Sequence, residues 1–553
     1  MAVSILLVSR QFTDSRFASC VIDDSILQMS WVQQFSRSLQ EGILMPRWLP
    51  DSNGGYGSPV FIFYSPLVYY VTAPLVWLTQ SVVLSMKLVR LAGLFLSGLA
   101  MYYFASSLGG RKTGLATALV YVVLPFHVLD VSYWSLYAGT WAWIWFPLIL
   151  HGARQISSTS SSGILSPVFV LCYGTLVLTH LLSAYLFSFV IGAYCLCLSD
   201  RSNVLRNLSK VCANAFAGLA LVGFYFLPAI YEQRFVHIEY STLLPEFDFR
   251  NTLLFFPNPD LIASNPFQAK TIGLLQFITL VQGLWILLSL VLRVIDRQEP
   301  GYLPLRELAF AMGVAVGCIF LMSSWSIWVW ELVPGLPRVQ FSTRWLSIYS
   351  LVSALLISGG FLTSSSPRWS RTAARLGYLG VAGVSVVFAL LIVSRTCFLD
   401  QKCEELAAAH VYNAPEYNPK SMVDWKQRVM HPRDPPASLL EGSGEVLIER
   451  WTSEDRRIVI DARTPSWLKM RLYPYPGWTM RVDGQLAAAG PQALDGAMTV
   501  RVPEGRHDVS LQFQNTWWRT GSLIVSALAA GMMILAAVWK PHDRLGKLIS
   551  TYN

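Results

Sequence analysis

Residues 41–70 read EGILMPRWLPDSNGGYGSPVFIFYSPLVYY and gather charged, glycine and aromatic residues inside an otherwise apolar chain. Gly54, Gly55 and Gly57 let the backbone reach positive φ or approach a ligand closely. The phenylalanines and tyrosines that follow suit the boundary between lipid headgroups and acyl chains. The stretch therefore predicts a loop that lies against a membrane surface and presents charge, with a tight turn held by aromatic anchors as the alternative.

This stretch and the residues before it supply candidate functional side chains. Two carboxylates, Asp23 and Asp24, precede the loop. From Asp24 onward to residue 41, apolar residues recur with helical spacing on one face, which predicts an amphipathic helix lying on the membrane. The candidate substrate-binding residues within the loop are Arg47, Asp51, Tyr56 and Tyr64.

The composition is typical of a multi-pass helical membrane protein. Of 553 residues, 53% are hydrophobic and only 14% are charged. The net charge of +9 comes from lysines and arginines in short segments between apolar runs, so it sets membrane topology and does not indicate a nucleic-acid partner. Five of the eight cysteines fall inside apolar runs, where we expect them to pack as small hydrophobic side chains. The sequence has no zinc-type cluster of cysteines and histidines.

Eleven apolar runs predict transmembrane helices. They cover residues 88–108, 115–127, 136–150, 164–179, 181–198, 211–231, 272–294, 308–328, 345–362, 376–393 and 521–539. Alternate loops carry the lysines and arginines and are expected in the cytoplasm. The loops 232–271, 329–344 and 394–520 then face outside, and so does the N-terminal loop.

Residues 60–83 leave a second topology open, because this run is itself apolar and long enough to span. Twelve helices and a cytoplasmic N-terminus would follow. The Ser58-Pro59 and Ser65-Pro66 pairs interrupt a helix early and favour an interfacial or re-entrant segment instead. Residues 1–8 are too short to span, so we expect the chain to begin late, at the end of a first helix whose start lies upstream.

Beyond residue 396 the hydrophobic period changes to two, as in EVLIER, RRIVID and HDVSLQF, which predicts an antiparallel β-sandwich outside the membrane. Asp483-Gly484 and the turn 503–505 read as hairpin-type turns. Cys397 and Cys403 form a candidate disulfide, with two free thiols as the alternative. The expected divisions are an outer-face loop with interfacial helices (1–86), a transmembrane domain (87–395), the β domain (396–518) and a final helix with a cytoplasmic tail (519–553).

Several strings together resemble a known group: PRWLPDSNGGYGSPVFIFYSPL, LPFHVLDVSYWSLYAGTWAWIWFPL, LTHLLSAYLF, LPAIYEQRFV, LPRVQFSTRW, and YPYPGWTMRVDG through VPEGRHDVSLQF. They are similar to bacterial membrane proteins of the GT-C glycosyltransferase-like superfamily, and most similar to a set labelled "6-pyruvoyl-tetrahydropterin synthase-related". The resemblance covers residues 24–518. The pterin label finds no support, because that enzyme needs a zinc site of three histidines in a soluble fold.

The resemblance implies a fold of about 11–12 transmembrane helices with a C-terminal extracytoplasmic β domain, in the bacterial cytoplasmic membrane. It also implies transfer of a sugar from a polyprenyl-phosphate donor to a lipid or envelope glycan acceptor on the outer face. Asp24, rather than Asp23, occupies the position of the catalytic base. A guanidinium from Arg47, Arg338 or Arg344 would assist the leaving phosphate. Four residues near the outer ends of helices would line the cavity, although each alone reads as a hydrated helix-end group: His127, Asp130, His180 and Glu232.

Three polar residues of the family pattern are replaced. Similar proteins carry a histidine, an arginine and a glutamate where this chain has Gln28, Trp134 and Gly139. The replacements leave either a different specificity or a lost activity. The alternative function is therefore a non-catalytic envelope protein that binds lipid-linked glycan or assists its assembly. No cofactor follows from the sequence, and a divalent metal stays open.

Overall fold

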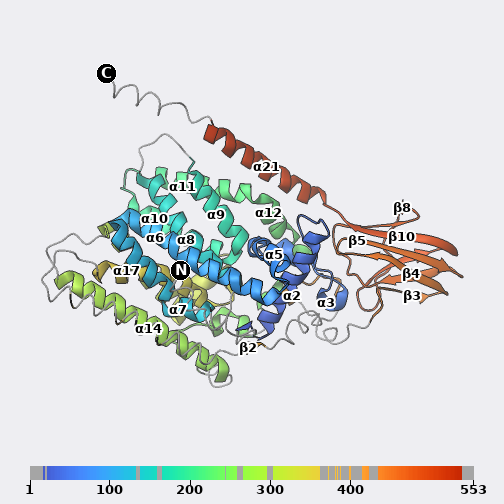
Figure 1. Ribbon diagram of the computed structural model, residues 1–553, viewed down its shortest axis with the longest axis horizontal. Helices are drawn as coiled ribbons and strands as arrows, with labels where there is room; N and C mark the ends of the chain where they lie inside the picture. Colours follow the sequence, from blue (N-terminus) through green and yellow to red (C-terminus); the bar gives the residue numbers. More distant parts are fainter. Residues whose placement is uncertain are drawn as a thin grey trace.

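The computed structural model describes residues 22–131, 137–158, 165–242, 245–257, 266–295, 303–361, 414–422 and 434–538, with a few isolated positions elsewhere. A body of apolar helices occupies most of the molecule, and a β-sandwich stands at one end (Figure 1). The last helix, α21 (Trp517–Val538), leaves the sandwich and runs back along the helical body. The prediction of a mainly helical membrane protein with a C-terminal β domain is confirmed.

Two predicted spans follow each other in α6 (Val82–Val123). The helical backbone of α6 is broken at Gly109 and Gly110. Gly110 has φ of 83°, a conformation that favours glycine, and it lets the second half fold back on the first. The two halves touch closely, since a Cβ added to Gly114 would lie 1.9 Å from Ser106 Oγ. Small residues thus build a tight helical hairpin.

The remaining helices match the other apolar runs, apart from 376–393, where only isolated positions are described. They are α8 (Tyr137–Ser158), α9 (Pro167–Thr179), α10 (Leu181–Leu198), α11 (Val204–Leu221), α12 (Gly223–Tyr231), α14 (Pro266–Ile295), α15 (Leu305–Leu321) and α17 (Trp345–Phe361). By length and apolar character, 4 helices in the described ranges can cross a membrane, or up to 5 if the sharply bent pair α11 and α12 counts as one. The number eleven stays a prediction.

The N-terminal region forms four helices, of which the first, third and fourth share one apolar core. They are α2 (Ile22–Gln40), α3 (Ser52–Gly55), α4 (Val60–Phe63) and α5 (Leu67–Thr79). The predicted break falls between α4 and α5, at Ser65-Pro66. With 13 residues, α5 extends only about 20 Å, less than the hydrocarbon core of a bilayer. The run 60–83 is therefore not one continuous spanning helix.

The expectation that the loop aromatics meet lipid is wrong for most of them. Trp48, Phe61 and Tyr69 are at most 3% exposed, and Phe63 is 7% exposed. Phe61 and Tyr69 pack with Phe35 of α2, whereas the Trp48 ring lies 5.5 Å from that of Trp478 in the sandwich. Hydropathy measures removal from water, and it does not distinguish a lipid neighbour from a protein neighbour.

The sandwich consists of two antiparallel sheets. Their order is β4-β5-β10-β7-β8 in one sheet and β3-β6-β9 in the other. The strands are β3 (Ala437–Glu441), β4 (Gly444–Trp451), β5 (Asp455–Ala462), β6 (Ser466–Met470), β7 (Trp478–Val482), β8 (Gln485–Leu486), β9 (Met498–Val502) and β10 (Gly505–Phe513). Alternate side chains of both sheets form the core, and Trp48, Ile62 and Phe63 of the N-terminal region join it.

The two predicted turns have different outcomes. Asp483 and Gly484, at φ of 50° and 78°, join the paired strands β7 and β8, so this hairpin is confirmed. The turn 503–505 joins β9 to β10, which belong to different sheets. The hairpin expected there is wrong, because turn-forming residues specify a reversal of the chain and not the partner of the next strand.

Candidate functional site

Helix α2 brings the catalytic candidates toward a group of tyrosines. Asp23 and Asp24 lie in its first turn, where only the backbone belongs to the described part of the structure. Gln28 follows Asp24 by one helical turn. Its Nε2 donates to the Tyr64 hydroxyl at 3.2 Å, and its Oε1 accepts from the Tyr69 hydroxyl. The amide that replaces the family histidine is thus held by two phenols.

Two of the residues selected from the sequence, Tyr64 and Arg344, interact electrostatically with Tyr417, and a third, His180, interacts with Arg344. Burial raises the pKa of the Tyr417 phenol well above its ordinary value, Tyr64 raises it further, and Arg344 lowers it. Burial and the nearby Arg344 lower the pKa of His180 to about 3, so this imidazole is neutral at pH 7. We call Gln28, Tyr64, His180, Arg344 and Tyr417 the Tyr417 cluster.

Local structure fixes the two basic members of this region. His180 sits between α9 and α10 as the N-cap of α10, where its Nδ1 accepts from the backbone amide of Ser183. Arg344 Nη2 donates to Gln340 Oε1 at 3.2 Å at the start of α17. The exposed Arg338 donates to Gln233 Oε1 at 3.3 Å. Two guanidinium groups near one helix end are suited to hold a phosphate.

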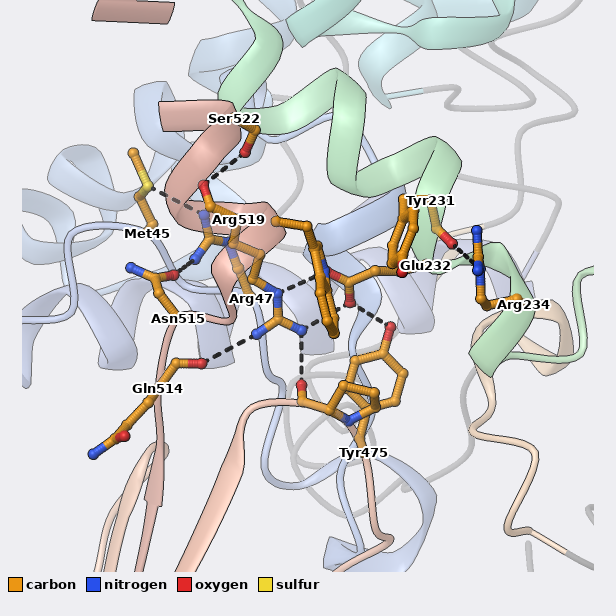
Figure 2. Close-up of polar contacts among 12 residues, drawn as sticks. Met45, Arg47, Tyr231, Glu232, Arg234, Tyr475, Gln514, Asn515, Arg519 and Ser522 are labelled. Atoms are coloured by element: carbon orange, nitrogen blue, oxygen red, sulfur yellow. Dashed lines mark hydrogen bonds and ion pairs between the residues drawn. The ribbon is translucent and has the colours of Figure 1, made fainter. Parts of the chain in front are cut away.

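Glu232 is enclosed and fully engaged (Figure 2). Arg519 donates to both of its carboxylate oxygens, at 2.7 and 2.8 Å, and neither side chain has solvent exposure. The Tyr475 hydroxyl and Trp518 Nε1 each donate to it at 2.8 Å. We call these four residues the Glu232 lock. It joins α12, the sandwich and the first turn of α21.

Arg47 lies beside this lock and not in the Tyr417 cluster. Its Nη1 donates to the Asn515 side chain (Figure 2). Burial lowers the pKa of the Arg47 guanidinium, Arg519 lowers it further, and Glu232 and Glu454 raise it. Arg47 therefore anchors the N-terminal loop to the segment that links the sandwich to α21.

The other loop candidates also tie the loop to its neighbours. Asp51, half exposed, accepts from Arg37 Nη2 at 2.7 Å. The Tyr56 hydroxyl lies 2.5 Å from Asp434 Oδ2 and 3.0 Å from Asp495 Oδ2. Its single proton can be donated to only one of the two carboxylates at a time.

His127 and Asp130 lie inside the helical body, each at most 1% exposed. The His127 ring stacks on Trp143 at 3.7 Å, and its Nδ1 lies 2.6 Å from the Tyr121 carbonyl oxygen. Asp130 interacts electrostatically with Arg90. The contacts that the structure describes for His127 do not connect it to the Tyr417 cluster, and neither residue is a hydrated helix-end group.

Sequence reasoning missed Tyr417, Arg519 and Glu454. An arginine in the first turn of an apolar helix indicates a buried partner. The sequence therefore contained a signal for Arg519. Nothing in the local pattern distinguished Tyr417. Cys397 and Cys403 lie outside the described residues. Within the described ranges, no group of three or more histidine, cysteine, aspartate or glutamate residues is placed to hold a metal ion.

No protein-family model matches the chain, and no curated protein matches it. Solved structures of the oligosaccharyltransferase AglB from Archaeoglobus fulgidus are similar in fold. The complex with an inhibitory peptide and a dolichol-phosphate has a TM-score of 0.43 and 12% identity, over 76% of this chain and 60% of that chain. The apo form gives the same values, and the complex with Zn and sulfate gives 0.43 and 14% over 76% and 58%. This chain thus spans less than two thirds of their length.

Proposed function

We propose that this chain is a membrane glycosyltransferase of the GT-C type. It moves a sugar from a polyprenyl-phosphate donor to a lipid or envelope glycan acceptor, on the outer face of a bacterial cytoplasmic membrane. The observation that supports this function is that Tyr64 and Arg344 both interact with Tyr417, and that His180 interacts with Arg344. Gln28, one turn after Asp24, bonds to Tyr64. Hydroxyls, an amide, an imidazole and a guanidinium thereby lie close to one another, and the backbone of Asp24 lies one helical turn before Gln28.

The chemistry divides among these groups. An acceptor hydroxyl attacks the anomeric carbon, the bond from that carbon to the phosphate oxygen breaks, and the hydroxyl proton passes to Asp24. Arg344 and Arg338 stabilise the charge of the departing polyprenyl phosphate. His180 is neutral at pH 7, so it orients substrate hydroxyls by hydrogen bonding and adds no charge.

The transfer assay uses the purified protein, a panel of polyprenyl-phosphate sugars and lipid acceptors. Asp24→Asn should abolish transfer because an amide accepts no proton, and Arg344→Lys should lower it by about tenfold because the planar fork is lost. Asp200→Asn, a carboxylate paired with Arg306 at the other end of α10, should leave transfer unchanged. Unchanged turnover in Asp24→Asn rules out the assigned base.

The outer-face orientation has its own test. Leu494 in the sandwich and Leu205 at the start of α11 are both strongly exposed, and the charge pattern places them on opposite sides of the membrane. In a cysteine-free chain, a membrane-impermeant maleimide added to intact cells should label Leu494→Cys and not Leu205→Cys. The reverse pattern would place the Tyr417 cluster in the cytoplasm and remove access to an outer-face donor.

The second candidate function is binding of lipid-linked glycan without turnover. Gln28 favours it, because an amide held by Tyr64 and Tyr69 cannot exchange protons as the family histidine can. In the same assay this function gives retention of the labelled donor on the protein with no product from any acceptor. Restoring the imidazole with Gln28→His tests whether the replacement removed the activity.

A further inference from the structure

A surface pocket of about 390 Å³ lies between the sandwich and the loop that follows α2. Its volume falls within the range of small-molecule sites. Glu41 and Ile43 border it from the loop, the turn between β4 and β5 borders it with Glu454, and the end of β10 contributes Gln512. None of these residues belongs to the Tyr417 cluster.

The charges of the pocket exclude several classes of ligand. It carries three carboxylates, Glu41, Glu454 and Asp455, against one arginine, Arg450, which donates to Asp455 at 2.7 Å. A phosphate would therefore meet net negative charge. Within the described part of the chain, these three carboxylates are not placed as a group that could hold a metal ion. Apolar lining is limited to Ile43 and Phe513, which is too little for a lipid tail.

The hydrogen-bonding groups that remain are matched to a ligand with many hydroxyls. The Gln514 amide donates to the Gln512 carbonyl at 3.3 Å, and the Gln514 carbonyl accepts from the Thr479 hydroxyl at 3.4 Å. These bonds do not use the Gln512 amide or the second hydrogen of the Gln514 amide, which can donate to a ligand. Burial raises the pKa of Glu454 to about 7, although Arg47 and Arg519 lower it, so near neutral pH this carboxyl both donates and accepts. The half-buried Phe513 ring packs with Trp478 and lies under the Arg519 guanidinium, so it borders the pocket as a fixed apolar wall and not as an open stacking face.

We propose that this pocket is a saccharide-binding site for one or two neutral sugar residues of a glycan. It is separate from the Tyr417 cluster and does not depend on the proposed transfer chemistry. The pocket also contacts the Glu232 lock, since the Gln514 backbone carbonyl accepts from Arg519 Nη1 (Figure 2). The backbone amide of Arg47, which lies beside the lock, bonds to Glu454. A glycan seated here bridges the N-terminal loop and the sandwich.

Saturation-transfer NMR tests the site on the full chain in nanodiscs, with a panel of neutral monosaccharides and disaccharides and with inorganic phosphate. We expect at least one saccharide to bind and phosphate not to bind. Gln512→Ala and Glu454→Ala should weaken saccharide binding at least tenfold. The matched control is Glu445→Ala, an exposed β4 residue paired with Arg463 away from the pocket, which should bind as the wild type does.

Three results overturn the proposal: no saccharide binds, phosphate binds in preference, or binding persists at full strength in both pocket variants. The last result would place the sugar elsewhere, for example in the Tyr417 cluster. Binding that is lost in Gln512→Ala, in a protein that shows no transfer with any donor, supports the pocket while the proposed transferase function fails.

Discussion

Replacing Glu232 with glutamine leaves the Arg519 guanidinium charged in a site that has no solvent exposure. Removing one partner of a buried ion pair costs about 3–5 kcal/mol, because the remaining charge is desolvated and unpaired. Tyr475 and Trp518 donate to different carboxylate oxygens, so the single oxygen of glutamine accepts from only one of them. We therefore expect a loss of free energy of unfolding near the upper limit, about 5 kcal/mol. Arg519→Met strands the carboxylate instead and should cost as much or more.

The double variant Glu232→Leu/Arg519→Met separates this explanation from simple loss of contacts. Replacing both charges with apolar groups of similar size removes the desolvation cost as well as the attraction, so most of the stability should return. Unfolding is followed in detergent by tryptophan fluorescence, since Trp518 belongs to the lock and Trp48 lies close by. Arg463→Ala, which breaks a strongly exposed ion pair, is the control and should cost less than about 1 kcal/mol. The reasoning is refuted if the two single costs add in the double variant, or if either single variant unfolds like the control.

Two further predictions concern the contact between the N-terminal loop and the sandwich. The folded-state pKa of Glu454 is raised to about 7, so the folded chain holds this proton longer than the unfolded chain, and stability should fall as pH rises from about 4.5 to 7, by up to about 3 kcal/mol. Melting temperatures across this range should show the slope in the wild type and lose it in Glu454→Gln. Gly57→Ala should destabilise the fold by about 2 kcal/mol or more, because the new Cβ would lie 2.3 Å from the Trp48 indole. Gly42→Ala has a similar positive φ and open space, so it should cost less, and equal melting temperatures for the two variants would contradict the overlap.

Much of the fold follows from local chemistry, and the elements show why. The Gly109-Gly110 pair sits between two apolar runs, and the structure turns there. The Ser65-Pro66 pair breaks the run 60–83 into α4 and α5, as the restricted backbone before proline requires. Apolar and polar residues alternate in β5 and β10, and this pattern predicted the sandwich, since every second side chain of an amphipathic strand faces the core.

The candidate site depends on pairings that no local pattern contains. Arg519 and Glu232 lie 287 positions apart, and each alone reads as a charged residue at a helix end. Tyr417 stands in a short segment with no period, yet Tyr64 and Arg344 reach it from distant elements. Tyr64, His180 and Arg344 were candidates from the sequence, but Tyr417, which interacts with Tyr64 and Arg344, became visible only in three dimensions. Hydropathy also misplaced Phe61, because a ring buried in protein and one buried in lipid give the same signal.

The anchor of Arg47 beside the Glu232 lock has a consequence for biosynthesis. Arg47 emerges from the ribosome early, but the residue that accepts its hydrogen bond, Asn515, belongs to the last part of the described chain to be made. Until that point the loop with Asp51 and Tyr56 lacks its final anchor, even if the apolar helices are already in the bilayer. A nascent chain stopped before Asn515 would therefore carry an N-terminal loop without this anchor, and we expect a protease to cut it more readily. The order of the N-terminal loop thus depends on a segment that is synthesised 468 residues later.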